Sequence, residues 1–430
     1  MTVKQYIYLS LLLAAIDCVG ITVWQIYTSD FDVVPAVMLT VKLLLDGIFV
    51  FTNWRRVQFR TTELWITCWI LVGAGLGGAH VLMGSPEFLF SRILKDTVPA
   101  LLFVTKIAIF RNYFYERDLK YGSIVIATLV ISVANIVVFY ALGGENDMYV
   151  GLTPPVNPIL AGALAYSSAT LFLVGLVVIY YSGKRSYLVS ALVYLVSLVV
   201  ASKKLKSVVS RALLIRISTG LLVGIAVGVL MHGAIVEKLT TTASGAVESE
   251  DGVSAVTAIT SSGLDSDDLE KILYLATAGR SAEAMGIIDG MNFMDWLVGH
   301  GAGFTYSMEL LDGSVRENYA NAHFSPLGLT YKYGAPFALF LYFWLVRTIL
   351  RNQAVDRHRL FWRGVAILMF VQSFFAFNLF VEFLFPIALA AIQTRRNWFS
   401  HYVSTRSTSS PMIVAALVKP ELPDISRVVH

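Results

Sequence analysis

A histidine, an arginine and a run of alternating glycines mark one long polar stretch of this chain, residues 232–332. His323 lies near the end of the stretch, Arg280 lies in its middle, and the glycines fall between them at 299–303. Imidazole titrates near neutral pH, guanidinium keeps its charge, and glycine adopts backbone angles that other residues avoid. The stretch therefore combines a titratable group, a cation and a tight turn, which is a set that could do chemistry.

The length of the stretch also favours a function. Loops longer than about 15 residues are usually functional or disordered rather than simple connectors. Residues 240–263 are small and polar and predict a flexible strap, whereas apolar residues recur at near-helical spacing through 264–297. We expect helices there that lie against the membrane face or over a helix bundle. A polar segment, 316–323, then precedes the next apolar run.

Composition indicates that membrane helices position these residues. Of the whole chain, 56% is hydrophobic and only 14% is charged, whereas soluble domains carry about 25% charged residues. Mean hydropathy is +0.68. We therefore predict an all-α polytopic membrane protein, a bundle of about 10–12 transmembrane helices with one large helical extracytoplasmic loop. No feature of the sequence indicates nucleic-acid binding.

Apolar runs near the ~20 residues that cross a bilayer give the individual spans. They are 5–28, 33–52, 64–83, 121–142, 157–181, 187–202, 212–231, 333–350, 362–378 and 380–394. A further run, 97–110, is weaker because Lys106 interrupts it. The chain is expected to divide into an N-terminal bundle, an extracytoplasmic catalytic loop, C-terminal helices and a disordered cytoplasmic tail. These parts are 1–231, 232–332, 333–396 and 397–430.

Basic residues orient the spans, because short loops rich in lysine and arginine stay on the cytoplasmic side. They mark loops 53–63, 203–211 and 351–363 as cytoplasmic. The stretch 232–332 must then lie outside. Its fourteen acidic against five basic residues agree with that side.

Counting the spans exposes a conflict around Arg185. If all eleven runs cross, the turn 182–186 falls inside and the basic loop 203–211 falls outside, against the charge rule. Either 97–110 does not cross fully or a later segment is re-entrant, and the first is favoured here. That choice puts the Arg185 turn on the outer face. It also leaves three basic residues outside, namely Arg111, Arg117 and Lys120.

The order of motifs resembles that of one family. Ser-Gly-Lys-Arg-Ser at 182–186 follows a span, and then come a basic loop, a span, and the outer loop with Gly-Arg at 279–280. Gly-x-Gly-x-Gly at 299–303 and His323-x10-Gly334 complete the series. This series is similar to that of the O-antigen polymerase and O-antigen ligase superfamily. Those integral membrane glycosyltransferases act on glycans carried by undecaprenyl pyrophosphate.

The resemblance covers about 155–395, and the N-terminal spans agree with it in hydropathy. It implies that Arg185 and Arg280 bind the lipid pyrophosphate, since guanidinium offers a planar charged fork to phosphate. It implies that His323 is the base that accepts the proton of the attacking sugar hydroxyl. The resemblance implies a GT-C-like fold and the activity of a metal-independent, inverting-type glycosyltransferase without a cofactor. The expected substrate-binding residues are Lys184, Gly299, Gly301, Gly303, Tyr319, Asn321, Gly334 and Glu382.

The chain departs from the family beside the histidine. The family often has Asn directly after it, whereas here Phe324 follows and Asn321 precedes His323. Glu382, between the last two spans, stands where relatives carry an acid near the outer face. The amide and the acid are therefore matched less closely than the two arginines and the histidine.

Each of these residues also has a structural interpretation. His323 could be a histidine at a helix mouth, Arg280 an ordinary loop cation, Arg185 a topology anchor, and Glu382 an acid at the membrane interface. Paired acids could bind Mg²⁺, but topology and helix dipoles explain them as well, and no metal is expected. Those acids are Asp30, Asp32, Asp265, Asp267 and Asp268.

The functional prediction is a polysaccharide polymerase at the extracytoplasmic face of the bacterial inner membrane. It would transfer a growing undecaprenyl-pyrophosphate-linked glycan onto a lipid-linked repeat unit, making O-antigen or exopolysaccharide. Expected partners are the lipid-linked donor and acceptor, membrane lipid, a chain-length regulator and a flippase. The alternatives are an O-antigen ligase, which hands the same donor to lipid A core, and a lipid-linked oligosaccharide flippase or transporter. The shared motifs do not separate polymerase from ligase, whereas a transporter is expected to show internal repeats.

Overall fold

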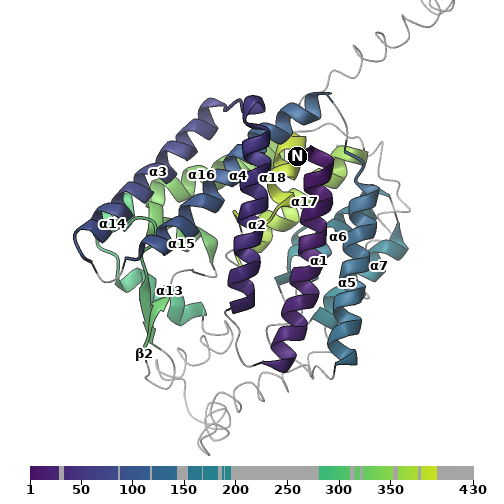
Figure 1. The fold of residues 1–430 in the computed structure, drawn as a ribbon, viewed down its shortest axis with the longest axis horizontal. Helices are drawn as coiled ribbons and strands as arrows, with labels where there is room; N and C mark the ends of the chain where they lie inside the picture. Colours follow the sequence, from purple (N-terminus) through teal and green to yellow (C-terminus); the bar gives the residue numbers. More distant parts are fainter. Residues whose placement is uncertain are drawn as a thin grey trace, which may run out of the picture. The chain divides into compact units, whose positions relative to one another are not determined.

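The fold is that of a computed structural model of the chain. It describes residues 1–28, 33–85, 88–116, 119–142, 154–166, 168–182, 186–187, 189–194, 280–309, 315–319, 322, 324–351, 357–375 and 379–394. This part of the chain is mostly helical and includes one small β-hairpin (Figure 1). Its contacts divide the chain into two units, Met1–Gln393 and Thr394–His430, and every element below belongs to the first.

The elements fall into three groups along the chain. The N-terminal group is α1 (Val3–Tyr27), α2 (Val33–Thr52), the 3-10 turn η1 (Trp54–Arg56), α3 (Thr61–Leu82), α4 (Phe90–Glu116), α5 (Gly122–Ala141), α6 (Val156–Ala165) and α7 (Ala169–Ser182). The middle group is α13 (Arg280–Asp289), α14 (Phe293–Val298), β1 (Tyr306–Glu309) and β2 (Val315–Tyr319). The C-terminal group is α15 (Ser325–Tyr333), α16 (Ala335–Arg351), α17 (Arg357–Gln372) and α18 (Leu384–Gln393).

Among the described residues, three helices are long and apolar enough to cross a bilayer, namely α3, α5 and the Val3–Trp24 part of α1. Shorter apolar helices lie in α6, α7, α16 and α18. The prediction of a helical membrane protein is confirmed at this level. Several predictions fall outside the described residues: span 212–231, most of span 187–202, strap 240–263 and tail 397–430.

Helix α4 runs without a break through the segment that Lys106 was expected to weaken. Its 27 residues extend about 40 Å at 1.5 Å per residue, which exceeds the bilayer core of about 30 Å. Lys106 is buried and bonded to Asp46 of α2, whose carboxylate also accepts the Tyr6 hydroxyl at 2.6 Å. A charge inside an apolar bundle requires such a partner, because water is not there to solvate it.

The last turns of α4 lie at the end of the bundle that carries the first basic loop. Arg111 is buried and bonded to Glu63 in the first turn of α3 and to Gln393 at the end of α18. The Asn112 side chain donates to the carbonyl of Arg56 at 2.6 Å. We call this the basic end of the bundle. The expectation that 97–110 does not cross fully stays a prediction, because α4 is not among the described helices that are long and apolar enough to cross a bilayer.

The predicted span 157–181 is instead two helices, α6 and α7. The hydroxyl of Ser168 accepts the N–H of Leu171 at 3.2 Å and so starts α7, a role for which serine is favoured. A Cβ placed on Gly175 would lie 2.8 Å from a methyl of Leu160, so the two helices pack closely. The chain therefore reverses direction within this segment.

This reversal determines where α7 ends. The start of α6 lies beside the end of α17, where Asn157 exchanges two hydrogen bonds with a glutamine. Helix α6 ends at the basic end, where the ring of Tyr166 packs on that of Tyr121. Helix α7 ends beside the last turn of α5, where the ring of Tyr181 packs on that of Tyr140. The chain leaves α7 opposite the basic end. The predicted topology places this end outside, and we call it the outer end. The prediction of a single span at 157–181 is wrong, because the segment is two antiparallel helices.

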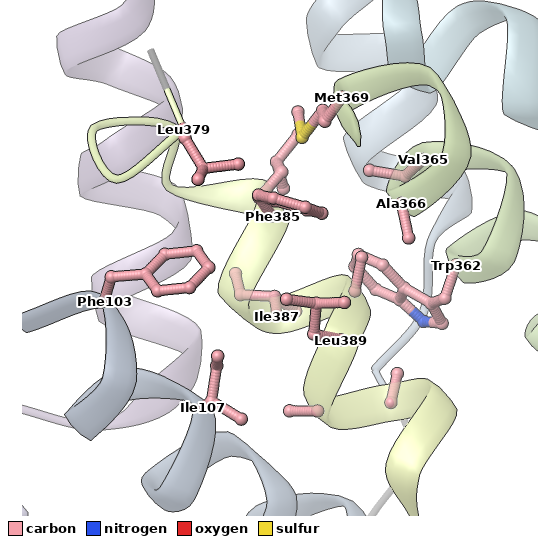
Figure 2. Packing of buried hydrophobic residues seen from close by; sticks show 14 of the residues in the cluster. Phe103, Ile107, Trp362, Val365, Ala366, Met369, Leu379, Phe385, Ile387 and Leu389 are labelled. Atoms are coloured by element: carbon pink, nitrogen blue, oxygen red, sulfur yellow. The ribbon is translucent and has the colours of Figure 1, made fainter. Parts of the chain in front are cut away.

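The centre of the bundle is formed by α4, α17 and α18. Figure 2 shows Phe103 and Ile107 of α4 beside Phe385 and Leu389 of α18, with Trp362 of α17 on the other side. The rings of Phe103 and Phe385 lie 5.6 Å apart, and all five side chains are buried. Helices α1, α2 and α3 keep many large apolar residues on their outer faces, as helices in lipid do.

A β-hairpin in the middle group was not predicted. Strands β1 and β2 pair antiparallel, with Met308 opposite Arg316, and α13 packs on β1. Helix α13 lies within 264–297 and α14 extends one residue beyond it, so the helical prediction is confirmed where that segment is described. In Figure 1 the middle group lies beside α3 and α15, while α5, α6 and α7 lie on the other side of α1.

Candidate functional site

The predicted site residues are described to different extents. Gly299, Gly301, Gly303, Gly334 and Glu382 are described in full, and Arg280 and Tyr319 are described as backbone. Lys184, Arg185, Asn321 and His323 lie outside the described residues. Four residues that flank them in the chain are described, namely Ser182, Ser186, Ala322 and Phe324.

The glycines after α14 adopt left-handed backbone angles that favour glycine. Gly299, Gly301 and Gly303 have φ angles of 79°, 102° and 86°, and Gly334 between α15 and α16 has 86°. A Cβ on Gly299 would lie 2.6 Å from the amide nitrogen of Gly334, and one on Gly334 would lie 2.3 Å from the carbonyl oxygen of Leu297. The end of α14 and the break between α15 and α16 are therefore locked together by backbone contact.

Two glycines of α3, which the sequence analysis did not single out, receive the turn at 299–303. The N–H of Ala302 donates to the carbonyl of Gly73 at 2.9 Å. A Cβ on Gly77 would lie 2.0 Å from the carbonyl oxygen of Ala302. Small residues four apart on a membrane helix permit such close approach, so their spacing was a usable signal. The glycine turn thus packs against a helix.

A buried ion pair joins this turn to α4. The Nζ of Lys332 in α15 lies 2.7 Å from Oδ1 of Asp96, and Oδ2 of Asp96 accepts the N–H of Gly303 at 2.8 Å. The two side chains are 1% and 6% exposed. One carboxylate therefore neutralises a lysine and satisfies the turn. The sequence analysis named neither charge, although ionisable residues within apolar segments are rare enough to signal a role.

Helix α13 begins at Arg280 and is fixed to the hairpin and to α15. The buried carboxylate of Glu283 accepts the Tyr306 hydroxyl at 2.5 Å. Ile287 lies in a buried cluster with Tyr306 and with Tyr331 of α15. The position of the first turn of α13 therefore depends on packing with elements that are distant in sequence.

The residues on either side of His323 connect α13 to α17. Ala322 is buried in the same cluster as Ile287. Phe324 packs on Phe374, just after α17, with ring centroids 5.8 Å apart. The segment around the predicted base and the helix that starts at the predicted arginine therefore share one apolar cluster.

Glu382 is half-buried between α17 and α18. The pKa of the Tyr187 hydroxyl is raised first by burial and then by the negative charge of Glu382. Tyr187 comes two residues after Arg185 and lies in helical structure. The charge of the predicted acid therefore reaches the segment that follows the other predicted arginine.

Polar contacts at the end of α17 tie three further elements together. The N–H of Ser325 donates to the carbonyl of Ser373 at 3.0 Å, and the hydroxyls of Tyr342 and Ser373 lie 2.9 Å apart. Next to them, the side-chain amides of Gln372 and Asn157 exchange hydrogen bonds of 2.8 and 3.1 Å. The sequence analysis missed this group, whose members lie singly at the ends of apolar runs.

His300, the histidine inside the glycine turn, occupies a packing position. Its ring stacks on Phe304 at 4.2 Å and lies edge-on to Tyr331 at 5.1 Å. Its Nε2 lies 3.6 Å from a carboxylate oxygen of Asp295. These contacts give His300 a role in packing the glycine turn against Phe304 and Tyr331.

No family model, curated protein or solved structure matches this chain. Among the described residues, no group of three or more His, Cys, Asp or Glu is placed to hold a metal ion. The acids considered for a metal all lie outside the described residues, namely Asp30, Asp32, Asp265, Asp267 and Asp268. The helical fold and its long apolar helices define the chain as a helical membrane protein.

Proposed function

We propose that this protein is a polysaccharide polymerase that acts at the outer face of a bacterial inner membrane. Its donor is a growing glycan on undecaprenyl pyrophosphate, and its acceptor is a lipid-linked repeat unit. A flippase would supply the repeat unit, and a chain-length regulator would act on the product. The proposal rests on the motif order described above together with one feature of the fold.

That feature is the position of four segments at one end of the bundle, with α13 beside α3 and α15 and with α7 on the other side of α1 (Figure 1). Helix α13 starts at Arg280, and its cluster includes the residue before His323. The chain leaves α7 for Arg185 at the same end. This shared end supports a site formed by the two arginines and the histidine.

The proposed reaction is an inverting substitution at the anomeric carbon of the donor. The acceptor hydroxyl oxygen attacks this carbon while its bond to the pyrophosphate oxygen breaks. The hydroxyl proton passes to His323, and the bonding electrons leave with the pyrophosphate. Arg185 and Arg280 would stabilise the negative charge that develops there, which is the largest single contribution in many enzymes.

The buried network around Asp96 and Lys332 supports precise positioning of the proposed base. Helix α15 begins two residues after His323 and ends at Gly334, where α14 locks onto it. Catalytic groups require support from rigid surrounding elements to hold a productive geometry. A helix held by an ion pair and a backbone turn supplies that support.

The glycan profile of a strain that lacks this protein tests the proposal. A polymerase predicts single repeat units attached to their normal acceptor and no long chains. Long chains that accumulate on the lipid carrier and are not attached would indicate the ligase instead. A wild-type profile, or loss of all repeat units from the outer face, would contradict both glycosyltransferase assignments.

A further inference from the structure

Helix α14 exposes its apolar residues instead of burying them. Phe293 is 75% exposed and Met294 is 62% exposed, and Leu297 and Val298 on the next turn are also exposed. The helix is capped by Asn292, whose side chain accepts two backbone N–H groups. A surface helix in water shows charged or polar residues on its outer face, so this exposure is the reverse of the usual pattern.

One side of helix α13 shows the same reversal, although Ile287 on its other side is buried. Met285 and Ile288 are exposed, whereas Glu283 is buried against Tyr306. A helix that turns its carboxylate inward and its thioether and alkyl groups outward suits an apolar surrounding medium. We name the surface formed by these two residues and the four of α14 the α13–α14 face.

The α13–α14 face continues the lipid-facing surface of the bundle. Helix α14 packs on α15 and α16, and Leu297 contacts the backbone at Gly334, where α16 begins. Immediately along α16, Leu339 is 72% exposed and Phe343 is also exposed. Apolar residues are therefore exposed both on a membrane helix and on the helix packed at its outer end.

Charge argues against an anionic headgroup as the partner that holds this face. No lysine or arginine lies between Arg280 and Arg316, while Asp289 and Asp295 are nearby. Anionic headgroups are bound by basic clusters, which this segment does not have. We infer that the α13–α14 face is inserted in the outer leaflet of the membrane and contacts lipid acyl chains. This inference concerns the surface alone and does not depend on the proposed reaction.

Photolabelling of the unmodified full chain in liposomes tests the inference. The probe is a phosphatidylcholine with a photoreactive diazirine in its acyl chain. Trypsin cuts after Arg280 and Arg316 and releases peptide 281–316, which carries the whole α13–α14 face. It also releases peptide 333–347, which carries the exposed apolar residues of α16 and serves as an internal control. We expect lipid adducts on both peptides, with those of 281–316 within α13 and α14. Adducts on 333–347 without adducts on 281–316 would overturn the inference.

Spin labels distinguish the alternatives for the same face. The native cysteines are first replaced, and nitroxide labels are placed at Phe293→Cys and Leu297→Cys. Each label should collide with oxygen at least fivefold more often than with a water-soluble nickel chelate. A label at Leu339→Cys on α16 should show the same ratio and reports the value for lipid. A label at Lys120→Cys, which is exposed at the basic end, reports the value for water. Collision with the chelate as at Lys120 would show a face in water. A label that collides with neither oxygen nor the chelate, and that shows dipolar coupling to the label of a second copy, would indicate a protein contact. A face in water or a face in a protein contact would overturn the inference.

Discussion

Asp96 of α4 and Lys332 of α15 form a buried ion pair, 2.7 Å between Oδ1 and Nζ, and the second oxygen of Asp96 binds the N–H of Gly303. The two residues are far apart in sequence and lie in apolar segments. Their contact connects the N-terminal bundle to the helix that follows His323. It also fixes the glycine turn, because the N–H of Gly303 donates to the Asp96 carboxylate.

Removal of one partner should destabilise the protein strongly. Lys332→Met should lower the free energy of unfolding by about 3–5 kcal/mol, because it leaves the Asp96 carboxylate buried without a counter-charge. Chemical unfolding in detergent micelles measures this change. The double variant Asp96→Asn with Lys332→Met should be more stable than Lys332→Met alone, since no buried charge remains. A single variant as stable as the wild type would contradict the role of the pair.

Gly77→Ala should separate the glycine turn from α3. The added Cβ would lie 2.0 Å from the carbonyl oxygen of Ala302, and overpacking of this kind costs about 1–3 kcal/mol. Gly75→Ala on the same helix is the matched control, because nothing lies within 4 Å of its added Cβ. It should be neutral or stabilising, since alanine favours helix by about 1 kcal/mol over glycine. Equal melting temperatures for the two variants would argue against the close packing.

The helices of the bundle were largely predictable from sequence, because apolar runs of bilayer length are a strong signal. The runs at 5–28, 33–52 and 64–83 correspond to α1, α2 and α3. The run 97–110 lies in a helix longer than hydropathy indicates, since hydropathy treats Lys106 as a penalty and does not register its partner Asp46. A buried ion pair cancels much of that penalty, but the partner is 60 residues away in sequence and no local rule identifies it.

The break between α6 and α7 was missed for a similar reason. The run 157–181 is apolar throughout, and Ser168 alone looks like a tolerated polar residue. Its role as a helix cap becomes visible when α7 is seen to fold back on α6. The candidate site shows the same limit, because Asp96 and Lys332 have no motif, and their function follows from their contact.

The side of the Arg185 turn can be tested with a cysteine at the adjacent position. In a chain with Cys18 and Cys68 replaced by alanine, Lys184→Cys should react with a membrane-impermeant maleimide added to intact spheroplasts. This follows because α7 ends at the outer end, beside Tyr140 of α5. Gln58→Cys, exposed at the basic end, should react only after permeabilisation. The opposite pattern of labelling would place the turn on the cytoplasmic side.

Arg280→Lys tests the proposed binding of pyrophosphate. Lysine keeps the positive charge but cannot form the two parallel hydrogen bonds of guanidinium, so polymer formation should fall by about 10- to 100-fold. Arg316→Lys is the control, because Arg316 is the other arginine of the outer loop and no phosphate contact is proposed for it. Transfer from lipid-linked donor to acceptor in proteoliposomes is the measurement. Equal rates for both variants and the wild type would remove Arg280 from the proposed site.

The most direct test of the proposed function is the polymer made by His323→Ala. Loss of a general base lowers a rate by about 10²- to 10⁴-fold, so long chains should disappear while protein level and lipid-linked single repeat units stay normal. His300→Phe, which keeps an aromatic ring on Phe304, should make polymer of normal length. Normal chain lengths in the His323→Ala strain would contradict the account.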